Sequence, residues 1–75
     1  MAHQSSAVRL TGTVARLLKD KGFGFIREDD GSREFFFHRS AVTRGDFDLL
    51  SEGHKVEFVE EHSDKGLRAD QVSTV

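Results

Sequence analysis

Apolar and polar residues alternate over several short segments of the chain, and polar turns separate these segments. Successive side chains of a β-strand point to opposite faces, so this alternation is typical of strands that bury one face. It predicts five strands, over residues 8–18, 22–27, 34–38, 55–62 and 67–75. The first strand is long and contains Gly12, which permits a bulge or kink.

The connections between these segments are polar and rich in turn-forming residues. Residues 28–32 are expected to form a hairpin loop with Asp30-Gly31 as the turn signal, and residues 19–22 and 63–66 to form tight turns. Ser40 is expected to cap a short helical turn over residues 39–42, before a long loop over residues 43–53. No convincing amphipathic helix is present, so the pattern predicts an all-β protein, a small five-stranded antiparallel barrel.

Phenylalanine is concentrated in the second and third predicted strands. Five of the seven phenylalanines fall between Phe23 and Phe37, and the chain has no Tyr or Trp. The alternation of faces divides the residues of each strand into two sets. In the second strand Phe23 and Phe25 share one face, and Gly22, Gly24 and Ile26 share the other. In the third strand Phe36 and His38 point one way, and Phe35 and Phe37 point the other.

The interior of one small barrel cannot hold all of these rings. One set is therefore expected to form an exposed aromatic surface, flanked by Lys21, Arg27 and Arg39. Exposed rings beside cations are what unstacked nucleic-acid bases bind. The pattern thus indicates a surface for single-stranded nucleic acid.

Length and composition limit the other possibilities. A chain of 75 residues is one domain, with residues 1–7 expected as a loose tail and residues 8–75 as the folded part. Cysteine is absent, so neither a disulfide nor a thiolate metal site is expected. No signal peptide and no apolar run of about 20 residues is present, so we expect a cytoplasmic protein without membrane contact.

Charge argues mildly against a general polyanion-binding surface. Eleven basic residues oppose thirteen acidic ones and give a net charge of −2, whereas nucleic-acid-binding domains are usually basic. The acidic residues gather late in the chain, at Glu57, Glu60, Glu61 and Asp64. Nucleic-acid binding therefore requires a fold that collects the cations in a local patch.

Nothing in the sequence predicts an enzyme, a cofactor, a metal site or a small-molecule substrate. His3, His54 and His62 lack metal-ligand spacing to another histidine or to a carboxylate, so a solvent-exposed position is expected for each. No nucleophile and base can be paired. Gly22-Phe23-Gly24 lacks the following helix that a phosphate-binding loop requires.

Two segments carry a resemblance to a known family. Lys21-Gly22-Phe23-Gly24-Phe25-Ile26 resembles the first ribonucleoprotein motif of the cold-shock domain family, and Phe35-Phe36-Phe37-His38 resembles the second. Similar flanking residues extend the resemblance from about Leu10 to Val75. It implies a five-stranded OB-like barrel that binds single-stranded RNA and DNA with little sequence preference. It also implies an RNA chaperone, often linked to cold stress.

The resemblance further implies which residues bind nucleic acid and which fill the barrel. The implied stacking platform consists of Phe23, Phe25, Phe36 and His38. Two lysines, Lys21 and Lys65, are implied to contact the phosphate backbone, and Phe47 to add a ring at the rim. The implied interior consists of Val14, Ile26, Phe35, Phe37, Val42, Val56, Phe58 and Val72. We expect a monomer, with a strand-exchanged dimer as the alternative.

The first strand departs from the family's pattern. The family usually carries a Lys-Trp-Phe trio where this chain reads Ala15-Arg16-Leu17, and Arg39 replaces a further aromatic residue. Arg16 and Arg39 can still stack through their planar guanidinium groups and pair with phosphate. Each stacked base contributes about 1–3 kcal/mol, so the loss of ring contacts weakens binding. A second interpretation therefore stays open, a cold-shock-like barrel that acts as a protein-interaction module.

Overall fold

The fold was analysed in a computed structural model, which describes residues 9–29, 31, 33–44, 47–64 and 66–75. The five expected strands are present as β1 (Arg9–Leu18), β2 (Phe23–Glu28), β3 (Glu34–His38), β5 (Lys55–Ser63) and β6 (Gly66–Thr74). The tail expected over residues 1–7 lies outside the described residues, as do Asp30 and Ser32 of the hairpin loop. The described part of the chain contains no helix long and apolar enough to cross a membrane.

The region between β3 and β5 is more structured than the sequence suggested. It holds a turn of 3-10 helix, η1 (Arg39–Ala41), the short strand β4 (Val42–Arg44) and a second 3-10 turn, η2 (Phe47–Leu49). The prediction that Ser40 caps the helical turn is wrong. His38 is the capping residue, because its side chain accepts a hydrogen bond from the Ser40 backbone N–H.

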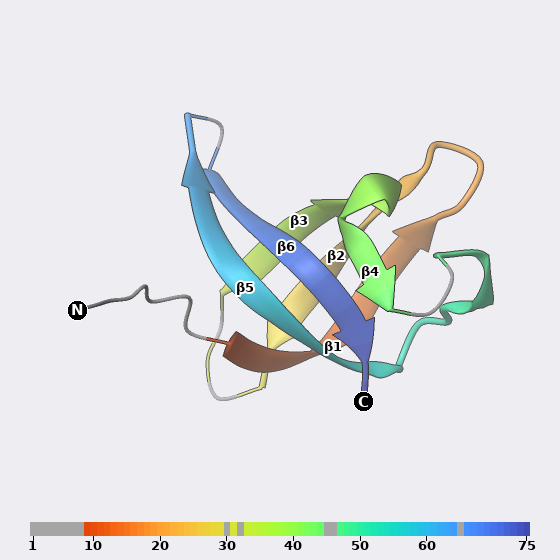
Figure 1. Cartoon of the computed structure of the whole chain (residues 1–75), viewed down its shortest axis with the longest axis horizontal. Helices are drawn as coiled ribbons and strands as arrows, with labels where there is room; N and C mark the ends of the chain where they lie inside the picture. The colour runs from red at the N-terminus through yellow and green to blue at the C-terminus, as the bar shows by residue number, and fades with distance from the viewer. Residues whose placement is uncertain (1–8, 30, 32, 45–46, 65) are drawn as a thin grey trace.

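The strands form one sheet that closes into a barrel, as expected. Its order is β3-β2-β1-β5-β6-β4, with a further pairing between β3 and β6. Strands β1, β2, β3, β5 and β6 make four antiparallel pairings, whereas β6 runs parallel to β3 and β4. Figure 1 shows β5 and β6 as a long hairpin that crosses in front of β2 and β3. The parallel contact between β3 and β6 closes the sheet into the barrel.

The first strand is shared by both halves of the barrel. Residues 9–13 pair with β5, and residues 12–18 pair with β2, so Gly12 and Thr13 have a partner on each side. The register of the β1–β2 pair shifts between Val14 and Arg16, so the bulge lies at Ala15 and not at Gly12. Gly12 meets a different requirement: a Cβ there would stand 2.6 Å from the Arg27 carbonyl oxygen and 2.7 Å from Ile26 Cγ2. This close approach leaves no room for a side chain.

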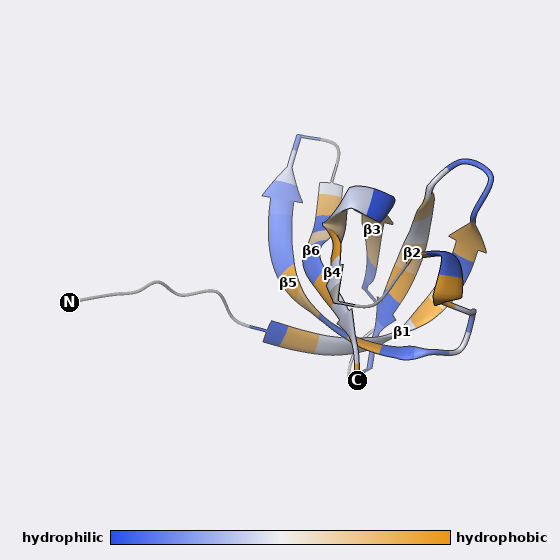
Figure 2. Cartoon of the chain, turned by 45° about the vertical axis from the view of Figure 1, so that its right-hand side comes forward, coloured by the Kyte–Doolittle hydropathy of each residue, from blue (hydrophilic) through white to orange (hydrophobic). Residues whose placement is uncertain are grey.

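The barrel interior is filled by aromatic and branched side chains. Apolar and polar stretches alternate along the strands in Figure 2, as expected for strands with one buried face. The buried apolar residues are Val14, Ile26, Phe35, Phe37, Ala41, Phe47, Leu50, Val56, Phe58, Ala69 and Val72. All the expected interior residues are among them except Val42, which is half-buried and packs against them. The rings of Phe35 and Phe58 lie 4.9 Å apart.

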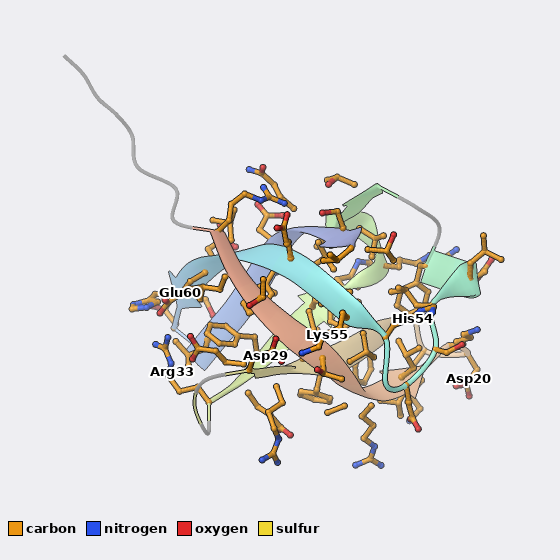
Figure 3. All side chains as sticks on the ribbon, turned by 90° about the horizontal axis from the view of Figure 1, so that it is seen from below. Asp20, Asp29, Arg33, His54, Lys55 and Glu60 are labelled. Atoms are coloured by element: carbon orange, nitrogen blue, oxygen red, sulfur yellow. The ribbon has the colours of Figure 1, made fainter. Side chains whose placement is uncertain are left out.

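Charged side chains hold the base of the β2–β3 hairpin against β5. Arg33 donates two hydrogen bonds to Glu28, which is 7% exposed, and a third to Glu60. His62 also contacts Glu60, at 2.7 Å. The hydrogen bond from His62, followed by the charge of Arg33, lowers the pKa of the Glu60 carboxyl below its ordinary value. Figure 3 shows Arg33 and Glu60 close together, with Asp29 near Lys55, whose hydrogen bond lowers the pKa of Asp29.

Candidate nucleic-acid interface

The pairing of β2 with β3 brings the outward-facing rings together. Phe25 lies opposite Phe36, and Phe23 lies opposite His38. The ring centroids of Phe23, Phe25 and Phe36 are 5.4–6.0 Å from one another. These three rings are half-buried, and His38 is exposed. We call Phe23, Phe25, Phe36 and His38 the aromatic platform, and their outward orientation confirms the predicted division of faces.

The opposite face of the same two strands points into the barrel. Phe35 and Phe37 have no exposed surface. Gly24 pairs with Phe37, and a Cβ at this glycine would lie 2.6 Å from the Arg16 carbonyl oxygen and 2.9 Å from Phe37 Cε1. Gly24 therefore lets β1 and the Phe37 ring approach the backbone of β2.

Local backbone geometry orients the histidine of the platform. His38 Nδ1 accepts a hydrogen bond from the Ser40 backbone N–H at 3.1 Å and lies 2.9 Å from Ser40 Oγ. A ring nitrogen that accepts from an N–H carries no proton, so the neutral ring is protonated at Nε2. His38 thus keeps an Nε2–H donor for a ligand. The only sequence feature that indicates this arrangement is the position of Ser40, two residues after His38.

Cations stand around the platform on β1, β2, η1 and the turn between β1 and β2. Arg16 of β1 lies opposite Phe25 and is exposed. Lys21 is exposed in the turn between β1 and β2, and Arg39 is exposed at the start of η1, beside Gly22. Arg27 is also exposed, at 3.9 Å from Glu34. Lys65, a further expected phosphate contact, lies outside the described residues.

Phe47 is not at the rim of this surface, and the prediction that placed it there is wrong. Its side chain is only 4% exposed, and its ring centroid lies 6.0 Å from that of Phe37. The turn η2 folds the loop back so that this ring closes one end of the barrel interior. Phe47 therefore contributes to folding, and its ring is not accessible to a stacked base.

Arg68 of β6 is a neighbour of the platform that the sequence analysis missed. It pairs with Phe36 across the parallel β3–β6 contact, and its guanidinium carbon lies 5.9 Å from the centroid of the Phe36 ring. This distance is within the range of a cation–π interaction. A row of outward-facing residues thus crosses four strands, with Arg16 and Arg68 at its ends and Phe25 and Phe36 between them. Only the closure of the barrel creates this row.

The platform continues into an open pocket of about 650 Å³. Phe25, Phe36 and His38 line one side, and the β5–β6 hairpin lines the other with Ser63, Asp64, Leu67 and Arg68. The pocket is concave, combines apolar rings with a few polar groups, and lies beside the contact between β3 and β6 that closes the barrel. These features are typical of ligand-binding sites.

Basic partners offset part of the negative charge of β5. Glu57 lies 3.5 Å from Arg9, and Glu60 lies 3.1 Å from Arg33. The cations Arg16 and Arg39 form no ion pair among the described residues. The surface around the platform is therefore more favourable to phosphate than the net charge of −2 indicates.

Comparison with known proteins agrees with this geometry. The sequence profile of the 'Cold-shock' DNA-binding domain matches residues 10–75. The cold shock-like protein CspG of Escherichia coli K12 is 43% identical over 67 residues, covering 89% of this chain and 96% of that protein. The cold shock-like protein CspA of Stigmatella aurantiaca is 45% identical over 65 residues, covering 87% and 96%. Among solved structures, drosophila Unr CSD456 matches with a TM-score of 0.73 at 27% identity, over 93% of this chain and 28% of that chain.

Proposed function

Because the chain belongs to the cold-shock domain family, whose members bind nucleic acid, we propose that it binds single-stranded RNA and DNA by stacking unpaired bases on the aromatic platform. One observation carries the proposal. Three phenylalanine rings lie within 6.0 Å of one another on the outside of a barrel whose interior other phenylalanines already fill. Half-exposed rings leave apolar surface in contact with water, which is unfavourable for a small domain. A base that stacks on the rings removes that surface from water.

Each part of the surface has a role in this proposal. Phe23, Phe25 and Phe36 stack on successive bases, at about 1–3 kcal/mol per base. The Nε2–H of His38 donates to a base or sugar oxygen. The cations that surround the platform attract the phosphates: Arg16, Lys21, Arg39 and, beyond the described residues, Lys65. Stacking recognises the faces of the bases, so sequence preference is weak, with a bias to thymine-rich and other pyrimidine-rich strands.

An RNA chaperone activity follows from the same binding. Paired bases cannot reach the rings, so the protein binds open strands in preference to duplexes. Binding shifts the equilibrium of an RNA hairpin toward its open form by mass action and needs no ATP. We place this activity in the cytoplasm, where a monomer offers one platform to each strand segment.

Titration of a fluorescent oligo-dT strand tests the proposal. We expect Phe23→Ala and Phe36→Ala each to lower affinity by about 1–3 kcal/mol, since each removes one stacking partner. Leu49→Ala is the matched control, because Leu49 is 74% exposed on η2, outside the platform. Circular dichroism checks that the variants stay folded. Wild-type affinity in a folded Phe36→Ala variant would exclude the platform as the binding surface.

Salt dependence and strand pairing test the remaining steps. If three or four cations contact phosphate, the slope of log affinity against log salt is about −2 to −3, at roughly −0.7 per contact. A slope steeper than about −5 would require a cationic surface elsewhere. A hairpin stem should bind much more weakly than its unfolded strand, and equal affinities would contradict the chaperone mechanism.

A second function is favoured by the departures on β1. Ala15, Arg16 and Leu17 replace a cation and two rings, and the net charge is −2. A barrel with these changes could serve as a protein-interaction module in which the platform contacts apolar side chains. The same titration separates the two functions, because a module of this kind binds neither oligo-dT nor its RNA counterpart at low salt.

A further inference from the structure

The pocket beside the platform contains more than a stacking surface needs. Phe25, Phe36 and Leu67 supply an apolar floor, whereas Asp64 and Arg68 bring a carboxylate and a guanidinium group to its wall. The rings alone are sufficient for stacking, so stacking does not account for the two charged groups. A pocket in which polar groups converge on an apolar floor can also distinguish one ligand from another.

Arg68 stands where it can hold a base against Phe36. Its guanidinium carbon is 5.9 Å from the ring centroid, and its side chain is exposed. Stacked planes lie about 3.4 Å apart, the spacing of bases along a strand, so a base between the two groups requires about 6.8 Å. A movement of about 1 Å in an exposed arginine side chain supplies the difference. Both the ring and the planar guanidinium group then contact a face of the base.

Asp64 presents acceptors to the edge of a base in this position. Its side chain is exposed in the lining of the pocket, and among the described residues it forms no ion pair. An ionised carboxylate only accepts hydrogen bonds. Guanine offers two adjacent donors on its pairing edge, N1–H and N2–H, which match the two carboxylate oxygens. Thymine and uracil offer one donor, and adenine and cytosine place an acceptor nitrogen beside their amino group.

We propose that this pocket is a guanine subsite, in which the base lies between Phe36 and Arg68 and its pairing edge faces Asp64. The proposal rests on the proposed function and refines it. The platform itself tolerates any base, while the pocket at its β6 end prefers one guanine within the bound strand. A hydrogen bond from a neutral donor to a carboxylate is stronger than one between two neutral groups, which supports the preference for guanine.

Short strands that carry one guanine test the subsite. A thymine heptamer is compared with a set of heptamers in which guanine replaces thymine at each position in turn. We expect one or two positions to raise affinity about fivefold, the low end for a bidentate contact with a base, because Asp64 is solvent-exposed. Inosine at the same position lacks the N2 amino group and should recover less than half of the gain. No gain at any position would overturn the inference.

Two variants identify the residues that produce the gain. Asp64→Ala should abolish the guanine advantage, while Asp48→Ala, which removes an exposed carboxylate outside the pocket, should preserve it. Arg68→Lys keeps the charge but loses the planar group, so it should reduce the advantage at least twofold. Arg27→Lys, on the same outer surface but outside the pocket, is its control.

The outcomes separate this inference from the proposed function. If all heptamers bind with equal affinity, the stacking platform stands and the guanine subsite is wrong. If the guanine advantage survives Asp64→Ala in a variant that circular dichroism shows to be folded, Asp64 is not its cause and the inference is also overturned. If no heptamer binds, the proposed function fails together with the subsite.

Discussion

Phe36 and Phe37 are neighbours in the same strand, yet they have opposite roles. Phe36 is half-buried on the outside and touches two other rings, while Phe37 has no exposed surface and lies against Phe47. These differences arise because the two side chains point to opposite faces of β3. The comparison shows that residue type alone does not decide whether a phenylalanine contributes to folding or is available for binding. The face of the strand on which it lies does.

The two faces also differ in what surrounds their rings. The inner face is closed by backbone and apolar side chains, as the 2.6 Å approach at Gly24 demonstrates. On the outer face Arg16 and Arg68 end the row of rings, and a pocket opens beside it. The inner face therefore has no space for a larger side chain, whereas the outer face has space for a ligand.

Removing the buried ring should damage the fold far more than removing its exposed neighbour. We expect Phe37→Ala to lower the free energy of unfolding by about 3–5 kcal/mol, a large part of the total of about 4–11 kcal/mol for a domain of this size. Phe36→Ala should cost much less. The chain has no Trp or Tyr, so urea unfolding is best followed by circular dichroism. A greater loss in Phe36→Ala than in Phe37→Ala would invert the assignment of the two faces.

Adding one carbon to the inner face should also destabilise the barrel. Gly24→Ala places a methyl group within 3.0 Å of Arg16, Leu17 and Phe37 atoms, and we expect a loss of about 1–3 kcal/mol from overpacking. Gly31→Ala is the control, because the atom nearest to its added Cβ is Glu28 Oε1 at 3.3 Å, which needs to shift by only a few tenths of an ångström. Thermal unfolding of both variants measures the effect. Equal melting temperatures would mean that β1 and β2 separate easily at this point.

Adding a ring to the outer face should improve binding without affecting the fold. Arg16 is exposed opposite Phe25, so tryptophan at this position extends the row of rings. We expect Arg16→Trp to raise affinity for thymine-rich strands by roughly 1 kcal/mol and to reduce the magnitude of the salt slope by up to about 0.7. Affinities at two salt concentrations measure both effects. Unchanged binding would place β1 outside the ligand path and favour the interaction module.

A charge change away from both faces should affect only the pH dependence of stability. The pKa of Glu60 is lowered in the folded state, chiefly by the hydrogen bond from His62. A lowered carboxyl pKa contributes stability above the ordinary carboxyl pKa of about 4.3, and this contribution is lost as the pH falls through the lowered value. Glu60→Gln should therefore flatten the fall in melting temperature between pH 5 and pH 3.

Oligo-dT affinity at pH 7 should remain unchanged in Glu60→Gln, because Glu60 does not line the platform or its pocket. Glu61→Gln is the matched control, since Glu61 forms no ion pair among the described residues. Its acid unfolding should follow that of the wild type. A Glu60→Gln variant with an unchanged acid profile would show that the contacts of Glu60 with Arg33 and His62 contribute nothing in solution.

Much of this fold could be predicted from the sequence because strand alternation is a local property. The apolar positions repeat with period two, so the faces of β2 and β3 follow from the order of Phe23, Phe25, Phe35, Phe36 and Phe37. The polar turns indicated how many strands the chain contains, except that the short strand β4 was not predicted. The roles of the platform residues in binding, in contrast, remain predictions that the experiments above test.

The local sequence pattern therefore encodes the strands and the two faces of each, whereas the closure of the sheet sets which residues surround the aromatic platform. Phe47 turned inward because η2 folds its loop over the end of the barrel. Arg68 came to lie opposite Phe36 through the parallel β3–β6 contact. Contacts of this kind join segments far apart in the chain, and no local pattern encodes them. They depend on how the sheet closes, which is set by the shape and volume of the whole interior.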